Sequence, residues 1–409
     1  LEIKYGHFGV YDINGFKEYP YWSLKSKEFT KSYEEAVSDI RYLVTSAVEY
    51  QMVSDVPVCS FLSGGLDSCI VTAIASNYLK KQGKTFNTFS FDFKDNDKYF
   101  VSNSFQPEQD RPYVDIMLEN FNVNHTYLEC NEEELADYLY LSVDAKDLPG
   151  MADVDASMLY FCKLVKEHNK VALTGECADE IFGGYPWFHR SDFINADTFP
   201  WSVNYNVRNS ILNNDAVSEL DIKGYIDKQY KISLSQVPIL EGETGLKKRQ
   251  REISFLNIKW FMTTLLDRMD RASMYSGLEA RVPYADHRIV EYMWNVPWEY
   301  KCPKGVTKGL LRDSVKDLLP PEIAQRKKSP YPKTYSPNYE KLLKERVSCI
   351  LYDKSSPILP LLNKDEVTKL INSSSDYGKP WFGQLMAAPQ LLAYIIQVNY
   401  WLKKFHISI

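Results

Sequence analysis

The chain has 409 residues, of which 44% are hydrophobic and 25% are charged. This composition is typical of a folded globular protein with one large or two medium cores, and it argues against predominant disorder. The formal net charge is -6, so the chain lacks the basic balance with which nucleic-acid-binding proteins neutralise phosphates. We therefore expect no nucleic-acid partner.

The seven cysteines are scattered along the chain, without C-x-x-C pairs or the Cys/His spacing of a zinc site. They are typical of reduced thiols. No apolar run approaches the roughly 18 residues of a membrane span, and the N-terminus lacks the layout of a signal peptide. We expect a cytoplasmic protein that does not enter a membrane. The first residue is Leu1 rather than Met, which suggests that the chain is part of a longer product.

Two segments precede the first motif. Residues 1–30 contain short alternating stretches and the aromatic cluster Tyr19-Pro20-Tyr21-Trp22, which suit a hairpin or an extended linker. In residues 33–52 apolar side chains recur at helical spacing. This pattern predicts an amphipathic helix whose inner face carries Ala36, Ile40, Leu43, Val44, Ala47 and Val48.

A strand, a loop and a helix are predicted next. Residues 57–62 are short, apolar and bounded by proline and glycine, as expected of a buried parallel strand. Residues 63–68 read Ser-Gly-Gly-Leu-Asp-Ser. Residues 67–80 then have the pattern of a helix with small residues on its inner side. The sequence thus predicts a glycine-containing loop between a buried strand and a helix N-terminus.

Further strands are predicted at residues 85–91, 125–129 and 171–173, the last after a helix at 156–168. Alternating strands and helices imply an α/β fold, with a parallel sheet flanked by helices. After residue 190 the strand signals fade, and 251–275, 308–319 and 386–403 have helical patterns. We expect residues 31–190 to form the α/β core and 191–409 to be mostly helical, as one continuous unit or two closely packed lobes.

The loop at residues 63–68 has the features of an anion-binding turn. Its two glycines allow tight folding, so that backbone N–H groups and the N-terminus of the next helix point at one anion. The loop lacks the lysine of the common P-loop, and Asp67 suits Mg²⁺ better than phosphate. A bare Ser-Gly-Gly string is more often a helix-capping turn, and only its place between strand and helix favours phosphate binding.

A second motif follows the strand at 171–173. Residues 174–185 read Thr-Gly-Glu-Cys-Ala-Asp-Glu-Ile-Phe-Gly-Gly-Tyr and place three carboxylates beside a strand end. Ligands of open parallel sheets bind outside the carboxyl ends of the strands, so both loops are expected to face the same nucleotide. Taken alone, the acidic cluster is equally compatible with the solvated start of a helix.

Three stretches in the same order resemble the asparagine synthetase family. SGGLDS is similar to its pyrophosphate motif, LTGECADEIFGGY to its LSGEGADEIFGGY, and LEARVPYADHRIVE to its LEVRVPFLDHRLVE. The likeness continues through Lys308-Gly309-Leu310-Leu311-Arg312 to Arg326-Lys327-Lys328, and so spans roughly residues 33 to 332. It implies the adenine nucleotide alpha-hydrolase-like (PP-loop) fold of ATP pyrophosphatases.

The resemblance also implies a two-step ligase reaction. The β-carboxylate of aspartate attacks the α-phosphorus of ATP, giving β-aspartyl-AMP and pyrophosphate, and ammonia then displaces AMP to give asparagine. Asp67 and Asp179 are expected to hold Mg²⁺. The residues expected to bind ATP are Leu62, Ser63, Gly64, Gly65, Asp67, Ser68, Phe91, Thr174 and Gly175.

Two catalytic residues follow from the resemblance. Lys328 is expected to place its charge on the α-phosphate as that phosphorus becomes five-coordinate, with Lys327 as the alternative if the register slips by one residue. Glu176 is expected to take a proton from ammonium, which is no nucleophile until it is deprotonated. A tyrosine occupies this position in related cyclases, so Glu176 favours ammonia over an intramolecular amine.

Aspartate needs a cation for its free carboxylate and an acid for its amino group. Arg268, Asp270 and Arg271 supply both kinds of group on one predicted helix. Which of the three contacts the substrate stays open.

The chain departs from the family pattern in two ways. Cys177 replaces a glycine, so we expect either a backbone with negative φ or a narrower pocket. The family's glutaminase domain, which releases ammonia from glutamine, does not precede Leu1, and residues 1–30 resemble the linker that follows that domain. Two other functions compete: a carboxylate-adenylating cyclase of the β-lactam or lasso-peptide type, and a catalytically silent binding relative. A homodimer is compatible with the sequence.

Overall fold

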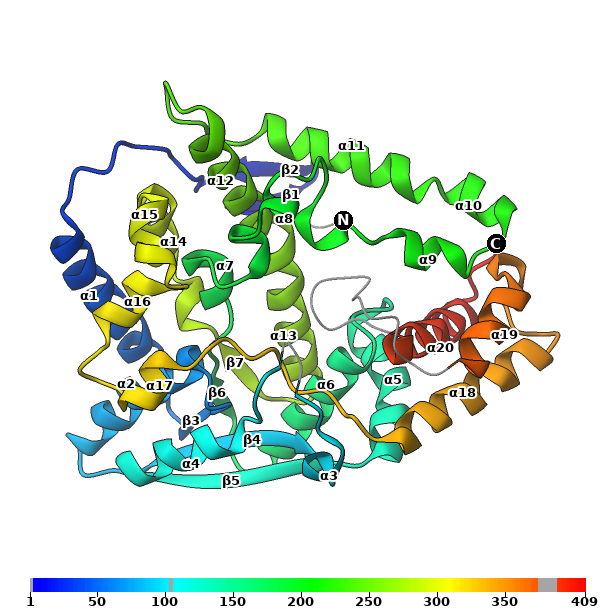
Figure 1. Cartoon of the computed structure of the whole chain (residues 1–409), viewed down its shortest axis with the longest axis horizontal. Coiled ribbons are helices and arrows are strands. Elements are labelled where there is room, and N and C mark those ends of the chain that lie inside the picture. The colour runs from blue at the N-terminus through cyan, green and yellow to red at the C-terminus, as the bar shows by residue number, and fades with distance from the viewer. Residues whose placement is uncertain (1–2, 103–105, 374–387) are drawn as a thin grey trace.

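The computed structural model of the chain describes residues 3–102, 106–373 and 388–409. At its centre is a five-stranded sheet in the order β5-β4-β3-β6-β7, and every neighbouring pair is parallel (Figure 1). The strands are β3 (Val58–Phe61), β4 (Phe86–Phe93), β5 (Val123–Cys130), β6 (Val171–Leu173) and β7 (Glu279–Arg281). The predicted α/β fold with a parallel sheet is confirmed.

Helices cover both faces of this sheet. Successive side chains of a strand point to opposite faces. Val58 and Leu173 therefore belong to a core with α1 (Tyr33–Gln51) and α2 (Leu66–Lys80). Cys59 and Ala172, one residue along each strand, belong to the core with α6 (Asp153–Lys166) and α13 (Thr263–Tyr275). Burial on both faces explains why these strands read as continuous apolar runs.

Strand β7 was not predicted. Its three residues, Glu279-Ala280-Arg281, are exposed or half-buried and include two charges, so they carry no β signal. The strand forms because its backbone pairs with β6, with Leu173 beside Arg281. The part of the chain after residue 190 is mostly helical, as expected, and β7 is its one strand within the described residues. The later part of the chain supplies both an edge strand and α13 to the α/β core.

The remaining elements are the predicted hairpin and a set of helices. The hairpin pairs β1 (His7–Asp12) with β2 (Gly15–Pro20). The helices are α3 (Asn96–Tyr99), α4 (Arg111–Asn120), α5 (Glu132–Lys146), α7 (Ala178–Phe182), α8 (Ser191–Ile194), α9 (Asn206–Ser210), α10 (Asn214–Leu220), α11 (Ile222–Ser235), α12 (Gly245–Leu256), α14 (His287–Asn295), α15 (Trp298–Lys301), α16 (Gly309–Ser314), α17 (Pro321–Gln325), α18 (Pro337–Tyr352), α19 (Lys364–Asn372) and α20 (Ala388–Lys404).

The helix boundaries follow local chemistry. Helix α1 begins at a capping box, in which Ser32 accepts from the backbone of Glu35 and the Glu35 carboxylate accepts from the backbone of Ser32. The predicted helix at 251–275 is one run made of α12, a π-helical segment at Asn257–Met262 and α13. The helix predicted at 308–319 is shorter, α16. Residues 386 and 387 of the last predicted helix lie outside the described residues. No helix in the described ranges combines the length and the apolar character needed to cross a bilayer.

The order of the strands brings the two sequence motifs together. From β3 the chain moves outward to β4 and β5, and it then returns to β6 on the other side of β3. Ser60 of β3 lies beside Leu173 of β6. The loops that leave the carboxyl ends of these two strands are therefore neighbours at the switch point of the sheet, where open α/β sheets bind their ligands.

Candidate active site

The loop at residues 63–68 forms a compact turn at the N-terminus of α2. Gly64 has a φ of 68°, and a side chain there would come within 2.7 Å of Tyr113 Cβ. The Ser63 and Ser68 hydroxyls are hydrogen-bonded at 3.0 Å. The N-cap of α2 is Gly65, and no side chain caps the helix. Its first N–H groups therefore remain available to an anion.

The acidic loop lies directly against this turn. A Cβ on Gly175 would stand 2.7 Å from the backbone nitrogen of Ser68, so only glycine permits the approach. Thr174 is fixed by a 2.9 Å bond from its N–H to the carbonyl of Arg281, which extends the pairing of β6 with β7. The two loops therefore lie side by side, as predicted, because their backbones pack closely.

Cys177 adopts a left-handed backbone conformation. Its φ is 71° and its side chain is buried. The first expectation for this position, a backbone with negative φ, is wrong. The side chain lines the cavity between the loops. A non-glycine residue in this region of φ/ψ space carries strain of about 1–2 kcal/mol.

This strain predicts an order of stability among variants of Cys177. We expect Cys177→Gly to change the free energy of unfolding by less than ~1 kcal/mol, because relief of strain offsets lost burial. Cys177→Val should lower it by ~2 kcal/mol or more, since a β-branched residue is disfavoured at positive φ. Urea unfolding measures both. Cys162→Val is the control, because Cys162 is buried within helix α6. It should lower the free energy of unfolding by less than Cys177→Val does.

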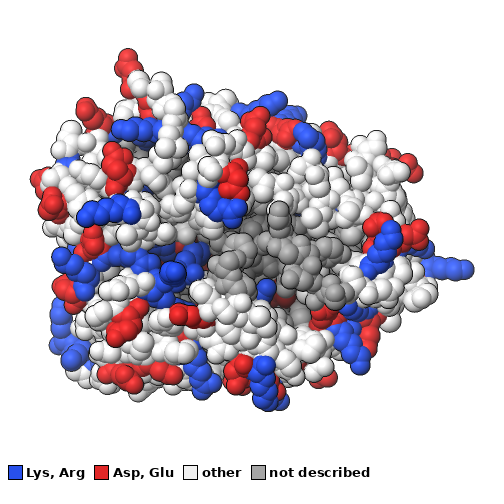
Figure 2. All heavy atoms as spheres, in the orientation of Figure 1, with Lys and Arg blue, Asp and Glu red and all other residues white. Residues whose placement is uncertain are grey.

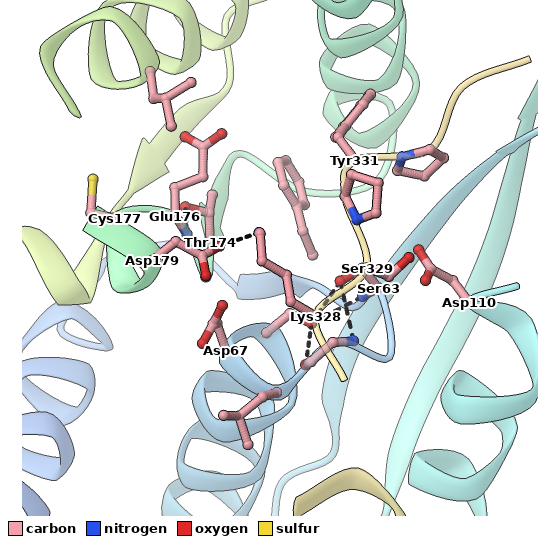
Figure 3. A pocket seen from close by; sticks show the side chains of 18 of the residues that line it. Ser63, Asp67, Asp110, Thr174, Glu176, Cys177, Asp179, Lys328, Ser329 and Tyr331 are labelled. Carbon is pink, nitrogen blue, oxygen red and sulfur yellow. Dashed lines mark hydrogen bonds and ion pairs between the residues drawn. The ribbon is translucent and has the colours of Figure 1, made fainter. Parts of the chain in front are cut away.

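Two lysines converge on the carboxylates of Asp67 and Asp179. Lys308 is 3% exposed, and its Nζ donates to Asp67 at 2.6 Å and also contacts Asp179. Lys328 donates to the other oxygen of Asp179. In Figure 3 the side chains of Asp67, Asp179 and Lys328 point toward one another from α2, the acidic loop and the segment after α17. This cluster forms the charged end of the site.

The electrostatics of the cluster differ between its two acids. Burial raises the pKa of Asp67, although the Lys308 ammonium opposes the change. Burial by itself would also raise the pKa of Asp179, but the ammonium groups of Lys308 and Lys328 prevail and lower it to about 2. Asp179 is therefore ionised at any physiological pH.

The carboxylates offer a partial set of ligands for Mg²⁺. Asp67 Oδ1 is buried and has no hydrogen-bond partner among the described residues. Mg²⁺ commonly takes one or two carboxylates and completes its shell with water and substrate phosphates. No group of three or more Asp, Glu, His or Cys side chains with metal-site geometry occurs in the described ranges. The residues therefore fit Mg²⁺ that arrives with a nucleotide, rather than a metal held by protein alone.

A further cation, Arg326, holds the turn at residues 63–68 in place. Its guanidinium donates to Asp110 Oδ1 at 2.6 Å and to the carbonyl of Ser63 at 3.3 Å, and it lies 3.9 Å from the centroid of the Tyr113 ring. Arg312 in turn donates to the carbonyl of Arg326 at 2.9 Å. The start of the segment that carries Lys328 is thereby tied both to the turn and to α16. Figure 2 shows basic side chains gathered on the face where this segment runs.

Glu176 lies on the side of Asp179 away from the Ser63 turn (Figure 3). Its carboxylate accepts a hydrogen bond from Arg268 Nη2, and its second oxygen is buried without a partner among the described residues. Burial raises the pKa of Glu176, and Arg268 opposes this shift. Arg268 Nε is also buried without a described partner. The pair therefore retains one free acceptor and one free donor inside the site.

One cavity of about 260 Å³ joins these groups. Among the predicted residues that line it are Leu62, Ser63, Gly65, Asp67, Ser68, Phe91, Thr174, Gly175, Glu176, Asp179, Arg268 and Lys328. Gly64 belongs to the turn but is not among the residues that line the cavity. Lys327 reaches the cavity from an exposed position, whereas Lys328 is half-buried and contacts Asp179. The structure thus directs Lys328, rather than Lys327, inward.

Asp270 and Arg271 lie elsewhere. Both are exposed on α13, and neither lines the cavity. Arg271 Nε is 3.5 Å from Asp267 on the outer face of the helix. Asp270 follows Arg268 by two positions and so points to the other side of α13. Arg271, three positions after Arg268, emerges beside it but turns outward toward Asp267. Of the three, only Arg268 has the orientation that the predicted contact with aspartate requires.

Three charged residues of the site were not assigned from the sequence: Lys308, Arg326 and Asp110. Lys308 and Arg326 lie within stretches that resemble the family, but a lysine or arginine in a polar stretch is usually a solvent-exposed charge. Their burial against carboxylates depends on contacts more than 200 positions apart. The match of Lys308-Gly309-Leu310-Leu311-Arg312 was the one signal that could have drawn attention to Lys308.

Comparisons with known proteins identify the family of the chain. The asparagine synthase family matches residues 39–403. The chain is 45% identical to asparagine synthetase [glutamine-hydrolyzing] 3 of Bacillus subtilis over 100% of its own length and 66% of the relative. It is 26% identical to asparagine synthetase [glutamine-hydrolyzing] 1 of the same organism, over 76% of the chain and 52% of the relative. It is also 24% identical to the amidase chry2 of Gibberella zeae over 81% of the chain and 58% of the relative.

The chain spans slightly less than two thirds of the first of these relatives and about half of the second. The family match covers most of the chain, including both loops at the sheet switch point and the segment that carries Lys328. The resemblance inferred from three motifs therefore extends over the fold as a whole, and the chain belongs to the asparagine synthase family.

Proposed function

We propose that the chain catalyses the ATP-dependent amidation of aspartate to asparagine through β-aspartyl-AMP, releasing AMP and pyrophosphate. One observation carries the proposal. The turn at residues 63–68 and two lysines lie at one end of a single cavity, and a half-buried glutamate, Glu176, lies at the other. This arrangement suits a reaction that first expels pyrophosphate and then needs a base.

The charged end supports the adenylation step. The N–H groups at the start of α2 and the hydroxyls of Ser63 and Ser68 would hold the β- and γ-phosphates. Lys328 and Lys308 would place positive charge where negative charge develops on the departing pyrophosphate. Mg²⁺ bound by Asp67 and Asp179 would supply further charge neutralisation along the phosphates. The apolar walls near Leu62 and Phe91 suit the adenosine.

The opposite end supports amide formation. Glu176 is half-buried and paired with Arg268, which holds its carboxylate toward the cavity. Its unpartnered oxygen would accept the proton that ammonium must lose before attack. Arg268 would bind a carboxylate of aspartate through its free Nε–H while it positions Glu176. The same arginine would then serve substrate binding and the orientation of the base.

We further propose that ammonia comes from glutamine through a glutaminase domain, as the names of the Bacillus subtilis relatives indicate. The β1–β2 hairpin exposes apolar side chains, including Tyr11 at 83% and Ile13 at 100% exposure. Such a surface suits contact with another domain. All seven cysteines are free thiols, in keeping with a cytoplasmic site of action. A homodimer stays a prediction.

The purified chain tests the proposal directly. With ATP, Mg²⁺, aspartate and ammonium it should form AMP, pyrophosphate and asparagine in equal amounts, and chelation of Mg²⁺ should abolish all three. Release of ADP would contradict the mechanism. If aspartate does not raise pyrophosphate formation above background, but a peptide or a carboxyethyl amino acid does, the chain is instead a cyclase. Glutamine without a glutaminase should not replace ammonium.

A further inference from the structure

A second cavity, of about 280 Å³, lies apart from the active-site cavity. It is lined by α12, the end of α14, α15, residues 27–29 and residues 240–243, and the two cavities share no lining residue among those described. The three helices lie next to one another at the upper left of Figure 1. Trp294 and Trp298 provide apolar wall, and Gln250 and Ser254 provide polar groups. None of these residues takes part in the proposed reaction.

Lys301 is the unusual group of this cavity. It is the last residue of α15, it lines the cavity, and only 5% of it is exposed. Its ammonium has no hydrogen bond or ion pair within the described part of the chain, and the nearest aromatic ring, that of Trp298, is centred 5.9 Å away. A buried charge without a partner is strongly unfavourable, so such a group requires a counter-ion or loses its proton.

The charged neighbours do not meet this requirement. Arg251, the closest cation, pairs with Glu243 and donates to the carbonyl of Trp294 at 3.2 Å. Glu299 stands 4.0 Å from Lys247 at the exposed rim. Burial, with a smaller contribution from Arg251, lowers the pKa of Lys301 to about 7. The remaining charged groups that line the cavity are exposed: Lys27, Glu28 and Glu241.

We propose that this cavity is a second ligand site, which binds a small anion whose carboxylate or phosphate group pairs with Lys301. The cavity is far larger than the ~30 Å³ share of one water molecule and approaches the ~300 Å³ at the small end of ligand pockets. An anion of about ten non-hydrogen atoms therefore fits. The tryptophans would contact its apolar part and Gln250 would donate to its oxygens. The inference is independent of the reaction proposed above.

Anion binding in this site is linked to protonation. A bound anion favours the charged form of Lys301 and so raises the pKa of its amine. Near neutral pH the amine therefore takes up a proton when the anion binds. Binding should be tightest below pH 7, where Lys301 is charged, and should weaken as the pH rises above 7. Lys301 is the group of this cavity whose protonation the anion changes, so Lys301 sets the pH dependence of binding.

Competitive acetylation of the wild-type chain tests the site at the level of one residue. Acetic anhydride is applied at pH 7, and the modified lysines are quantified by mass spectrometry. Lys301 should react, because about half of its amine is uncharged near its pKa. Inorganic phosphate or succinate should reduce its reactivity at least threefold and leave exposed Lys304 unchanged. Protection by phosphate alone or by succinate alone identifies the class of ligand. No protection by either anion, or no reaction of Lys301, overturns the proposal.

Two matched variants provide a second measurement. Lys301→Met removes the unpartnered charge, so it should fold and should melt at a higher temperature than the wild type at pH 7. Isothermal titration calorimetry measures its binding of the anion that protects Lys301 in the wild type. Compared with the wild type, Lys301→Met should bind one anion fewer, or its affinity for the anion should be at least tenfold lower. Lys304→Met, three residues along the same segment, should bind as the wild type does. Equal stoichiometry and affinity in all three proteins would refute the site.

Discussion

Replacing Lys328 by alanine is expected to lower the rate of aspartate-dependent pyrophosphate formation by about 100- to 1,000-fold, the usual effect of losing one donor to developing negative charge. The lysine extends from the segment after α17 to Asp179, at the charged end of the cavity. The rate is measured at saturating ATP and aspartate, so that altered binding does not obscure it. Thermal melting of the variant should remain close to that of the wild type.

Lys327→Ala is the matched control for this prediction. Lys327 precedes Lys328 directly but is exposed, so its loss should change the rate by less than about threefold, in line with a solvated charge. The opposite result, a severe loss in Lys327→Ala and near-normal turnover in Lys328→Ala, would show that the register of this segment differs from the one described here.

The second large effect is expected from Glu176→Gln. The amide cannot accept a proton from ammonium, so asparagine formation should fall by about 100-fold or more, the range of general-base catalysis. Adenylation does not need this base, and a rapid burst of pyrophosphate should persist. Quenched-flow measurement of pyrophosphate and asparagine in the same reaction separates the two steps.

The variant also leaves Arg268 buried beside a neutral partner, which destabilises the fold by an amount that melting will reveal. Glu180→Gln is the control in the same loop, because Glu180 is buried and accepts a 2.6 Å hydrogen bond from Tyr185 rather than from an arginine. It should preserve the ratio of the two products. Loss of burst and product together in Glu176→Gln would assign Glu176 to adenylation and would contradict its role as the base.

Much of the α/β core could be read from the sequence for a physical reason. Strands β3 and β6 are buried on both faces, so nearly every residue in them must be apolar, and glycine marks their ends. The turn at Gly64 and the close approach at Gly175 likewise admit no other residue. These requirements act within a few residues of the chain and therefore leave a local pattern.

Other features of the molecule leave no local pattern. Strand β7 exists because the backbone of Glu279–Arg281 finds an open edge beside β6. The left-handed conformation of Cys177 is imposed by the packing of the acidic loop. Whether Arg268 or Arg271 faces the cavity depends on how α13 is rotated against the sheet, and two arginines three positions apart look alike in a sequence.

The sequence alone determined the family, the parallel sheet and the two loops that meet at its carboxyl edge, because each depends on residues close together in the chain. Tertiary structure decided which charges are buried together. Lys308 meets Asp67, Arg326 meets Asp110, and Lys301 is left without a described partner beside a cavity. A charged side chain acquires its function from the charges and the solvent around it, and residues more than 200 positions away supply that surrounding for Lys308 and Arg326.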